Sequence, residues 1–192
     1  MERYWEGKTF SNQVLIEERL SDCEFVECQF ENCEFEKCVI EYCKFTDCSF
    51  KKCQIVEPKT DHTVMMDSRF YQCQLIGINW GILIGGGYMM PLEEVQDCQM
   101  KYNNFVELNL VKFDFSGNTI VSSLFGECNL RTSRFVDCDL DQTEFFKCDL
   151  SSADFRRATG YRIDLETNKL KKARFSFPEV TRLLDGLDIR ID

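Results

Sequence analysis

The strongest constraint on the fold of this chain is a five-residue period. Large apolar residues occupy most positions divisible by five between residues 10 and 175, and 14 of the 17 phenylalanines are among them. All 12 cysteines lie two positions before this phase, as in CEFVECQFENCEFEKCVIEYCKF at residues 23–45. A period of five matches neither the 3.6 residues of a helical turn nor the two-residue alternation of a strand. Neither a continuous helix nor a plain strand therefore explains the pattern.

The period fits a short extended segment followed by a corner. In Cys23-Glu24-Phe25 the first and third side chains share one face of an extended segment, and the charged middle side chain points away. Val26 and Glu27 then turn the chain before the pattern restarts. A chain that always turns in the same direction winds into a solenoid, with cysteine and phenylalanine inside and coils stacked about 4.8 Å apart.

The repeats resemble those of the pentapeptide-repeat family. The segments SSADF, TSRFVDCDLDQTEFFKCDL and ECNL closely follow its A(D/N)LXX consensus, and the resemblance covers about residues 9–175. It implies an all-β fold, a right-handed quadrilateral β-helix with four pentapeptides per coil. We expect this β-helix to occupy residues 1–175 and to be irregular or looped at 56–67 and 76–97.

Two stretches interrupt the pattern while keeping its phase. The first, residues 56–67, places Pro58 and Thr63 where small inner residues belong, and the second, residues 76–97, is apolar and contains three consecutive glycines. Either stretch is an irregular coil or a loop that contacts a partner, because long loops on compact scaffolds are often functional. In a partner loop, the anchoring residues would be Trp80, Tyr88, Met89 and Met90.

After Phe175 the sequence changes character. Ser176 is placed to cap a short helix with Glu179 as its capping-box partner, and LDIRID at 187–192 alternates as a short strand. Residues 176–192 therefore form either a cap for the solenoid or a dimer seam, and they resemble the C-terminal dimerisation module of Qnr and MfpA-type members of the family. That resemblance implies a homodimer through the apolar tail residues Val180, Leu183, Leu184, Leu187, Ile189 and Ile191.

No sequence pattern in the chain indicates a catalytic site. The single histidine, His62, has no fixed spacing to any cysteine, and no phosphate-binding glycine motif occurs. The C-x₄-C spacing places successive thiols on successive sides of a coil, unlike the converging C-x₂₋₄-C pairs of zinc sites. A column of stacked cysteines that binds a soft metal, or a ladder of disulfides, are alternatives to our interpretation of small buried spacers. We expect no enzymatic activity, no cofactor and no metal site.

Charge and hydropathy limit the kinds of partner that we expect the chain to bind. Acidic residues outnumber basic ones by 33 to 23, a net charge of −10, which argues against direct binding of nucleic acid or anionic membrane. No signal peptide or membrane span is recognisable, so we expect a cytoplasmic protein with reduced thiols. Acidic side chains at outward positions of the repeat include Glu24, Glu34, Asp114, Asp139, Asp149 and Asp154.

Two functions follow from these features. The Qnr and MfpA-type resemblance implies a DNA mimic that binds DNA gyrase or topoisomerase IV, both type II topoisomerases, and protects them from quinolones. The alternative is a scaffold for a different protein partner, with an acidity that serves solubility. A continuous acidic stripe on the surface would favour mimicry, whereas faces of mixed sign would favour the scaffold.

Overall fold

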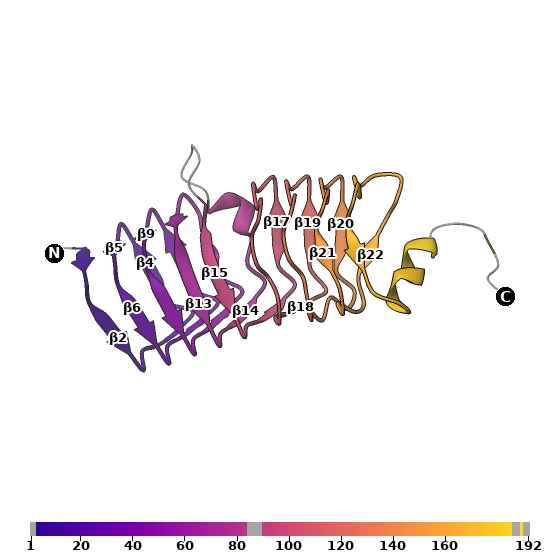
Figure 1. The fold of residues 1–192 in the computed structure, drawn as a ribbon. Helices are drawn as coiled ribbons and strands as arrows, with labels where there is room; N and C mark the ends of the chain where they lie inside the picture. The colour runs from indigo at the N-terminus through magenta and orange to yellow at the C-terminus, as the bar shows by residue number, and fades with distance from the viewer. Residues whose placement is uncertain (1–2, 84–89, 186–188, 190–192) are drawn as a thin grey trace. The chain divides into compact units, whose positions relative to one another are not determined.

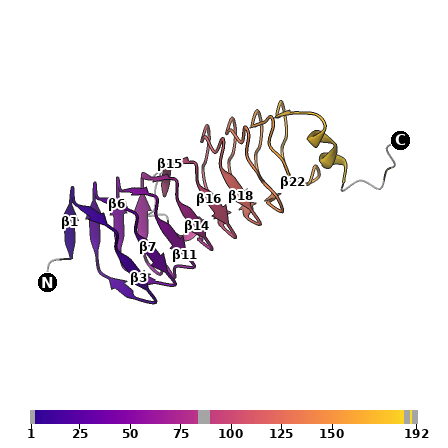
Figure 2. The ribbon, with the colours of Figure 1, turned by 90° about the horizontal axis from the view of Figure 1, so that it is seen from below.

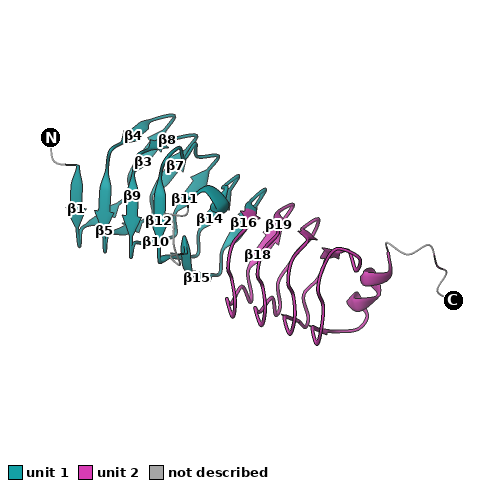
Figure 3. Ribbon diagram, turned by 90° about the horizontal axis from the view of Figure 1, so that it is seen from above, with its two compact units in different colours: residues 1–104 teal, residues 105–192 magenta. Residues whose placement is uncertain are grey.

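The chain folds into stacked coils of very short parallel strands. A computed structural model describes residues 3–83, 90–185 and 189. It divides the chain into two compact units, residues 1–104 and residues 105–192 (Figure 3). In each unit a strand pairs in parallel with a strand of the next coil, and the predicted right-handed quadrilateral β-helix is confirmed.

The first unit carries a sheet on each of three sides, and its fourth side is less regular (Figures 1 and 2). The three sheets are β1 (Tyr4–Glu6), β5 (Glu24–Val26), β9 (Lys44–Thr46) and β12 (Val64–Met66); β2 (Thr9–Ser11), β6 (Gln29–Glu31), β10 (Ser49–Lys51), β13 (Ser68–Tyr71) and β15 (Leu92–Gln96); and β3 (Val14–Ile16), β7 (Glu34–Glu36), β11 (Gln54–Val56), β14 (Gln74–Ile76) and β16 (Gln99–Lys101). On the fourth side, β4 (Arg19–Ser21) pairs with β8 (Val39–Glu41), and the 3₁₀ helix η1 spans Trp80–Ile82.

The pairing register shows how many residues complete one coil. Phe25 lies beside Phe45, twenty residues later, as the four-sided fold requires. One coil is longer, because Phe70 lies beside Val95 and Leu75 beside Met100, a separation of 25 residues. The five additional residues fall within the second interruption, residues 76–97. This interruption therefore keeps the five-residue phase while lengthening one coil.

The second unit continues the same pattern with fewer hydrogen-bonded strand residues. Its strands are β17 (Asn104–Val106, starting at the last residue of the first unit), β18 (Thr119–Val121), β19 (Leu124–Gly126), β20 (Glu144–Phe146), β21 (Asp154–Phe155), β22 (Arg162–Ile163) and β23 (Arg174–Phe175). Isolated parallel bridges such as Asn129 with Asp149 hold the sides that have no continuous sheet. The 3₁₀ helix η2 spans Glu179–Leu184.

Corners recur two residues after each large inner residue, and most of them adopt the left-handed backbone conformation. Asn32 has φ 51° and Lys52 has φ 53°. This conformation costs a residue other than glycine roughly 1–2 kcal/mol. The corner amide is paired in return, since Asn32 donates its N–H to the Lys51 carbonyl at 3.0 Å. The stacking of coils therefore offsets the strain of each corner.

Inside each unit the phenylalanines stack along the coils. The rings of Phe30 and Phe50 lie 4.7 Å apart and nearly parallel, and in the second unit Phe115 and Phe135 repeat the arrangement at 5.0 Å. Rings on neighbouring sides meet edge to face, as Phe125 and Phe135 do at 5.6 Å. Offset stacks and edge contacts are the two favourable geometries for aromatic pairs. The five-residue period therefore places one ring where it contacts both the next coil and the next side.

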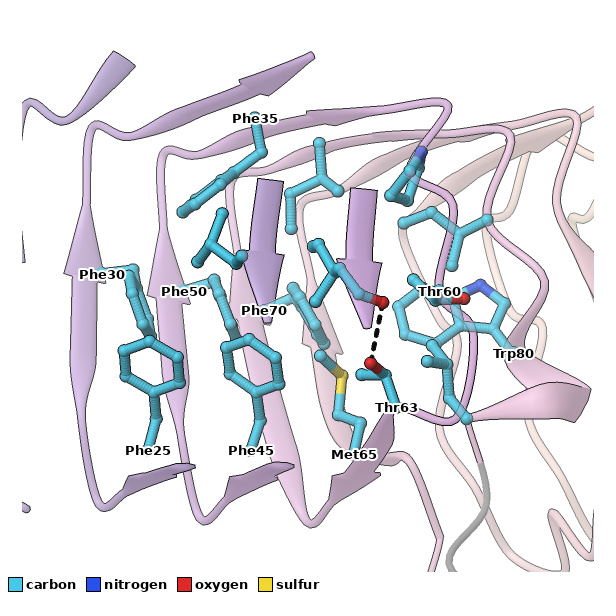
Figure 4. A pocket seen from close by; sticks show the side chains of 16 residues that line it. Phe25, Phe30, Phe35, Phe45, Phe50, Thr60, Thr63, Met65, Phe70 and Trp80 are labelled. Carbon is cyan, nitrogen blue, oxygen red and sulfur yellow. Dashed lines mark hydrogen bonds between the residues drawn. The ribbon is translucent and has the colours of Figure 1, made fainter. Parts of the chain in front are cut away.

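The first interruption, residues 56–67, lies within a coil. Thr63 takes the place of an inner cysteine, and its hydroxyl donates to the Ile40 carbonyl at 2.8 Å. Met65 takes the place of an inner phenylalanine and is buried. Beside them lies an interior cavity of about 50 Å³ with an apolar lining, shown with its side chains in Figure 4. These substitutions fill the interior less completely than the Cys–Phe pattern does.

The predicted capping box of the tail helix is wrong. The residue before η2 is Pro178, and no side chain caps the helix. The Ser176 hydroxyl accepts the Arg157 backbone N–H at 3.2 Å, and the Glu179 carboxylate accepts the Gly160 N–H at 2.8 Å. Both side chains thus bind the last coil instead of capping their own helix, although Glu179 also pairs with Arg182 within η2. The strand expected at 187–192 falls almost entirely outside the described residues.

Candidate functional site

The cysteines lie inside the coils. All 12 are buried without a disulfide, and their thiols donate to backbone carbonyls, as Cys138 does to Phe115 at 2.9 Å and Cys28 to Trp5 at 3.4 Å. Burial raises the pKa of the Cys48 thiol to about 11 and that of Cys138 to about 12. A thiolate is the reactive and metal-binding form, so these sites disfavour both kinds of chemistry. Among the described residues no group of three or more His, Cys, Asp or Glu side chains is placed to hold a metal ion.

In the candidate partner loop, Trp80 is not available to contact a partner. Trp80 is fully buried, and its ring packs edge-on against Phe70 at 5.5 Å, so its assignment to an exposed loop is wrong. Met90 is half-buried. Tyr88 and Met89 lie outside the described residues. Trp80 fills the interior in the phase of the phenylalanines, and η1 holds it there.

Most of the predicted acidic positions lie on the surface, with one exception. Glu24, Glu34, Asp114, Asp139 and Asp149 are exposed or half-buried. Asp154 is only 7% exposed, and its placement on an acidic surface is wrong.

The Asp154 carboxylate is held by two cations of the second unit. The Arg156 guanidinium lies at 2.7 Å and the Arg174 guanidinium at 3.5 Å. Hydrogen bonds from Arg156, opposed by burial, lower the pKa of Asp154. This carboxylate therefore stabilises the contact between two coils and offers little charge to a partner.

Ion pairs connect opposite charges on successive coils. They are the main electrostatic feature of the outer faces of the coils. In each pair the two residues are about one coil apart in sequence, so their side chains project side by side. The pairs at 4.0 Å or less include Lys44 with Glu24, Arg19 with Glu41, Arg134 with Asp114, Lys147 with Glu127, Arg157 with Asp137 and Arg162 with Glu144. The faces that carry them are of mixed sign.

The candidate dimer seam is only partly described. Val180, Leu183 and Leu184 on η2 are half-buried, and Ile189 is 54% exposed. Leu187 and Ile191 lie outside the described residues. The described part thus leaves some apolar surface on η2 accessible.

The described residues of each unit form a large surface hollow. In the first unit a groove of about 460 Å³ runs over β6, β10, β13 and β15, and Tyr71 within it donates to Glu94 at 2.6 Å. In the second unit a cleft of about 710 Å³ lies between η2 and the residues around β22. Phe146 and Leu165 are its most exposed apolar lining residues, beside the Glu144–Arg162 ion pair. Charged and apolar groups line both hollows, and both are accessible from solvent to the surface of a partner protein.

Comparison with known proteins agrees with this architecture. The family model described as pentapeptide repeats matches residues 19–53 and 123–159, with eight copies. These two segments are pentapeptide repeats, and the chain is similar to proteins of that family. Among curated proteins, none matches it. No helix in the described part of the chain is long and apolar enough to span a membrane.

Among solved structures, one of QnrB1 shares the fold of this chain. A trypsin-treated variant of QnrB1, a plasmid-mediated fluoroquinolone resistance protein, has a TM-score of 0.50 and 13% identity, covering 95% of this chain and 99% of its own. HetL from Nostoc sp. strain PCC 7120, involved in heterocyst differentiation regulation, has a TM-score of 0.30 and 12% identity, covering 90% of this chain and 87% of its own. At these identities the likeness to QnrB1 is one of fold alone.

The cations that pair with the surface carboxylates of this chain were not identified from the sequence. Lys44 and Arg134 were not among the candidate site residues, yet each determines the charge that its face presents. The signal was a separation of twenty residues between unlike charges, which becomes visible only once four repeats are known to complete a coil.

Proposed function

We propose that this protein is a non-catalytic scaffold that binds a protein partner through the charged faces of its coils. The observation that carries the proposal is the pairing of opposite charges between successive coils, as in Asp114 with Arg134 at 2.9 Å. A DNA mimic requires a run of uncompensated negative charge, whereas paired columns present both signs at fixed spacing. A protein surface of complementary pattern is the partner that such faces fit.

The geometry of the faces supports this role. Exposed ion pairs each contribute only about 0–1 kcal/mol to folding, so they are readily exchanged for contacts with a partner. The strands beneath them are fixed by pairing to both neighbouring coils, and this rigidity lowers the entropic cost of binding. Electrostatic patterning of this kind contributes mainly to specificity and to the association rate.

A charge-swapped variant tests the scaffold. The protein is immobilised, partners are captured from a lysate of its source with mild crosslinking, and the captured proteins are identified by mass spectrometry. In the double variant Asp114→Arg/Arg134→Asp the net charge is unchanged but the pattern of the face is inverted. We expect at least one captured protein that is not a type II topoisomerase, and the variant should retain much less of it. Equal retention by both proteins, or no captured protein, would contradict the proposal.

A second candidate is a DNA mimic that binds DNA gyrase or topoisomerase IV and gives quinolone protection. The observation in its favour is a corner column in the first unit, where Glu27, Asp47 and Asp67 follow one another on three successive coils. At a spacing of about 4.8 Å per coil they form a short acidic line, in which Arg69 lies 3.9 Å from the Asp47 carboxylate. The first unit contains 18 acidic and 10 basic residues, a net charge of −8. QnrB1, which shares the fold, is a fluoroquinolone resistance protein.

Supercoiling by gyrase and decatenation by topoisomerase IV, each with and without a quinolone, test the second candidate. It predicts inhibition or protection at micromolar protein, and loss of the effect in Glu27→Gln/Asp47→Asn/Asp67→Asn. The matched control is Glu17→Gln/Glu34→Gln/Glu57→Gln, which removes three carboxylates from another side of the same unit. An absence of both inhibition and protection excludes this candidate and leaves the scaffold.

A homodimer through residues 176–192 is part of the proposal. The accessible apolar side chains of η2 and the exposed Ile189 support it. Light scattering on the purified protein is expected to give twice the 22.6 kDa of one chain. A monomer at all concentrations would contradict the dimer without affecting the scaffold.

A further inference from the structure

One face of the second unit is basic although the chain as a whole is acidic. Successive coils place Asn109, Asn129, Asp149 and Lys169 in one column, as the parallel bridges between them show. The backbone bonds Lys112 to Arg131, Thr132 to Ser151 and Ser152 to Lys171 connect the same four coils two and three residues further along. The cations of this face, which we call the basic face, are all exposed: Lys112, Arg131, Lys169, Lys171 and Lys172. With Asp149 as its single carboxylate, the face has a net charge of +4.

The cations of the basic face differ from the other described cations of the second unit because none of them has an ion-pair partner within 4.0 Å among the residues that the structure describes. The seven other described cations of this unit each have one: Arg134, Lys147, Arg156, Arg157, Arg162, Arg174 and Arg182. Outside the basic face, the described residues of this unit include 12 carboxylates and these seven paired cations, so the uncompensated positive charge lies on a single face. A random scatter of surface lysines does not give this segregation.

The remaining side chains of the basic face suit an oxygen-rich anion. Asn129, Ser151 and Ser152 place amide and hydroxyl donors between the cations. Burial alone would raise the pKa of Asp149, but hydrogen bonds from Ser151 and the charges of Lys169 and Arg131 lower it below its usual value. The field at this face therefore already stabilises one carboxylate.

We propose that the basic face docks a short carboxylate-rich segment of a protein partner. This deepens the scaffold function and rests on it, because it specifies the chemistry of one partner surface. Three intervals between coils span about 14 Å, the length of about four extended residues. A segment of that length is covered by the cations of the face.

A nucleic acid fits the same face less well. Specific protein–DNA modules bury at least about 600 Å² of protein surface, and a duplex would therefore extend beyond the four coils onto neighbouring faces. Those faces carry exposed carboxylates that have no ion-pair partner among the described residues, such as Asp139 and Asp141. The net charge of −10 of the chain would also repel a long polyanion, whereas a short acidic segment ends before it reaches these groups.

The test uses a fluorescein-labelled peptide of four glutamates, which matches the length of the face, and the full-length protein at low salt, with binding followed by fluorescence anisotropy. We expect binding that weakens as salt rises, because the contacts are screened. In Lys171→Glu/Lys172→Glu the dissociation constant should rise at least about tenfold.

The matched control is Lys51→Glu/Lys52→Glu. These two lysines occupy the same two places of a repeat in the first unit, with φ 53° at Lys52 and 62° at Lys172, and the change in net charge is identical. The control should change the dissociation constant by less than about twofold. Circular dichroism confirms that both variants are folded.

Three outcomes would overturn the proposal. They are no anisotropy change up to about 1 mM protein, equal weakening in both double variants, and tighter binding of a single-stranded oligothymidylate with the same number of charges. The last would assign the face to nucleic acid. Capture of a partner by the scaffold does not depend on this peptide, so failure of the basic face is distinguishable from failure of the scaffold function.

Discussion

The guanidinium of Arg157 binds the carboxylate of Asp137 through two parallel hydrogen bonds, Nε to Oδ1 at 2.6 Å and Nη2 to Oδ2 at 2.7 Å. The two residues are twenty positions apart and occupy the same corner of successive coils. Such bidentate contacts are the strongest arrangement of this ion pair. Charge on this protein is therefore organised along the stacking direction.

Arg157→Gln should raise the pKa of Asp137. The pKa of this carboxyl is lowered, first by hydrogen bonds from Arg157 and then by its charge, with burial opposing both. Without the guanidinium it should return towards its usual value of about 3.9. Because the folded-state pKa is the lower one, the pair stabilises the fold above about pH 4, and that contribution is lost as pH falls through the folded pKa.

Carboxyl carbon NMR titration of Asp137 measures this shift. Arg156→Gln is the control, since Arg156 binds Asp154 instead. An unchanged Asp137 titration in Arg157→Gln would show that the contact does not persist in solution.

Gly160→Ala should destabilise the second unit more than Gly117→Ala. Both glycines have φ +76°, so each substitution carries the left-handed penalty of roughly 1–2 kcal/mol. A Cβ at Gly117 would meet nothing within 4 Å, whereas at Gly160 it would lie 2.6 Å from the Cα of Asp141. Overpacking against backbone adds roughly 1–3 kcal/mol. Denaturant unfolding compares the two variants, and equal losses would contradict the close approach.

Phe135→Ala should cost about 3–5 kcal/mol of unfolding free energy. Phe135 is fully buried and stacks on Phe115 at 5.0 Å and Phe155 at 4.8 Å. The control Phe175→Ala lies at the end of the same stack, half-buried, with one stacked neighbour at 5.3 Å. It should cost clearly less. Because stacked repeats can unfold in parts, hydrogen exchange of the two variants accompanies denaturant unfolding. A larger loss in Phe175→Ala would contradict this account of the core.

The thiols should react slowly in the folded protein. At pH 8 we expect few of the 12 cysteines to react with a disulfide reagent before unfolding and all of them afterwards, because burial keeps the reagent away from every thiol. At Cys48 and Cys138 the raised pKa also keeps the thiolate scarce. Cys138→Ala should cost only about 1 kcal/mol. Rapid reaction of native thiols, or loss of partner binding in a stable Cys138→Ala protein, would indicate chemistry that the burial does not predict.

The five-residue period predicted which side chains form the interior, and the error at Trp80 came from setting it aside. Trp80 occupies a position divisible by five, so the phase placed it inside, whereas its apolar, glycine-rich surroundings favoured a loop. Asp154 occupies an outward position, and only the arrival of Arg174 twenty residues later, together with Arg156, covers it.

Contacts between coils require the length of each coil, which the five-residue period alone does not contain. The basic face is an example. Lys112 and Lys172 are sixty residues apart in sequence and three coils apart in the second unit. The capping box failed for a related reason, because Ser176 and Glu179 found partners on the preceding coil.

The coil of 25 residues in the first unit has a consequence for how such chains change in length. Inserting one whole pentapeptide moves every later residue to the next side of its coil. Its position within its own five-residue repeat does not change, so inner residues stay inside. A duplication or deletion of five codons is therefore compatible with the interior pattern downstream, provided one side of one coil can bulge. Insertions of any other small number would turn cysteines and phenylalanines outwards in all later coils. This fold therefore tolerates insertions and deletions most readily when they comprise whole multiples of five residues.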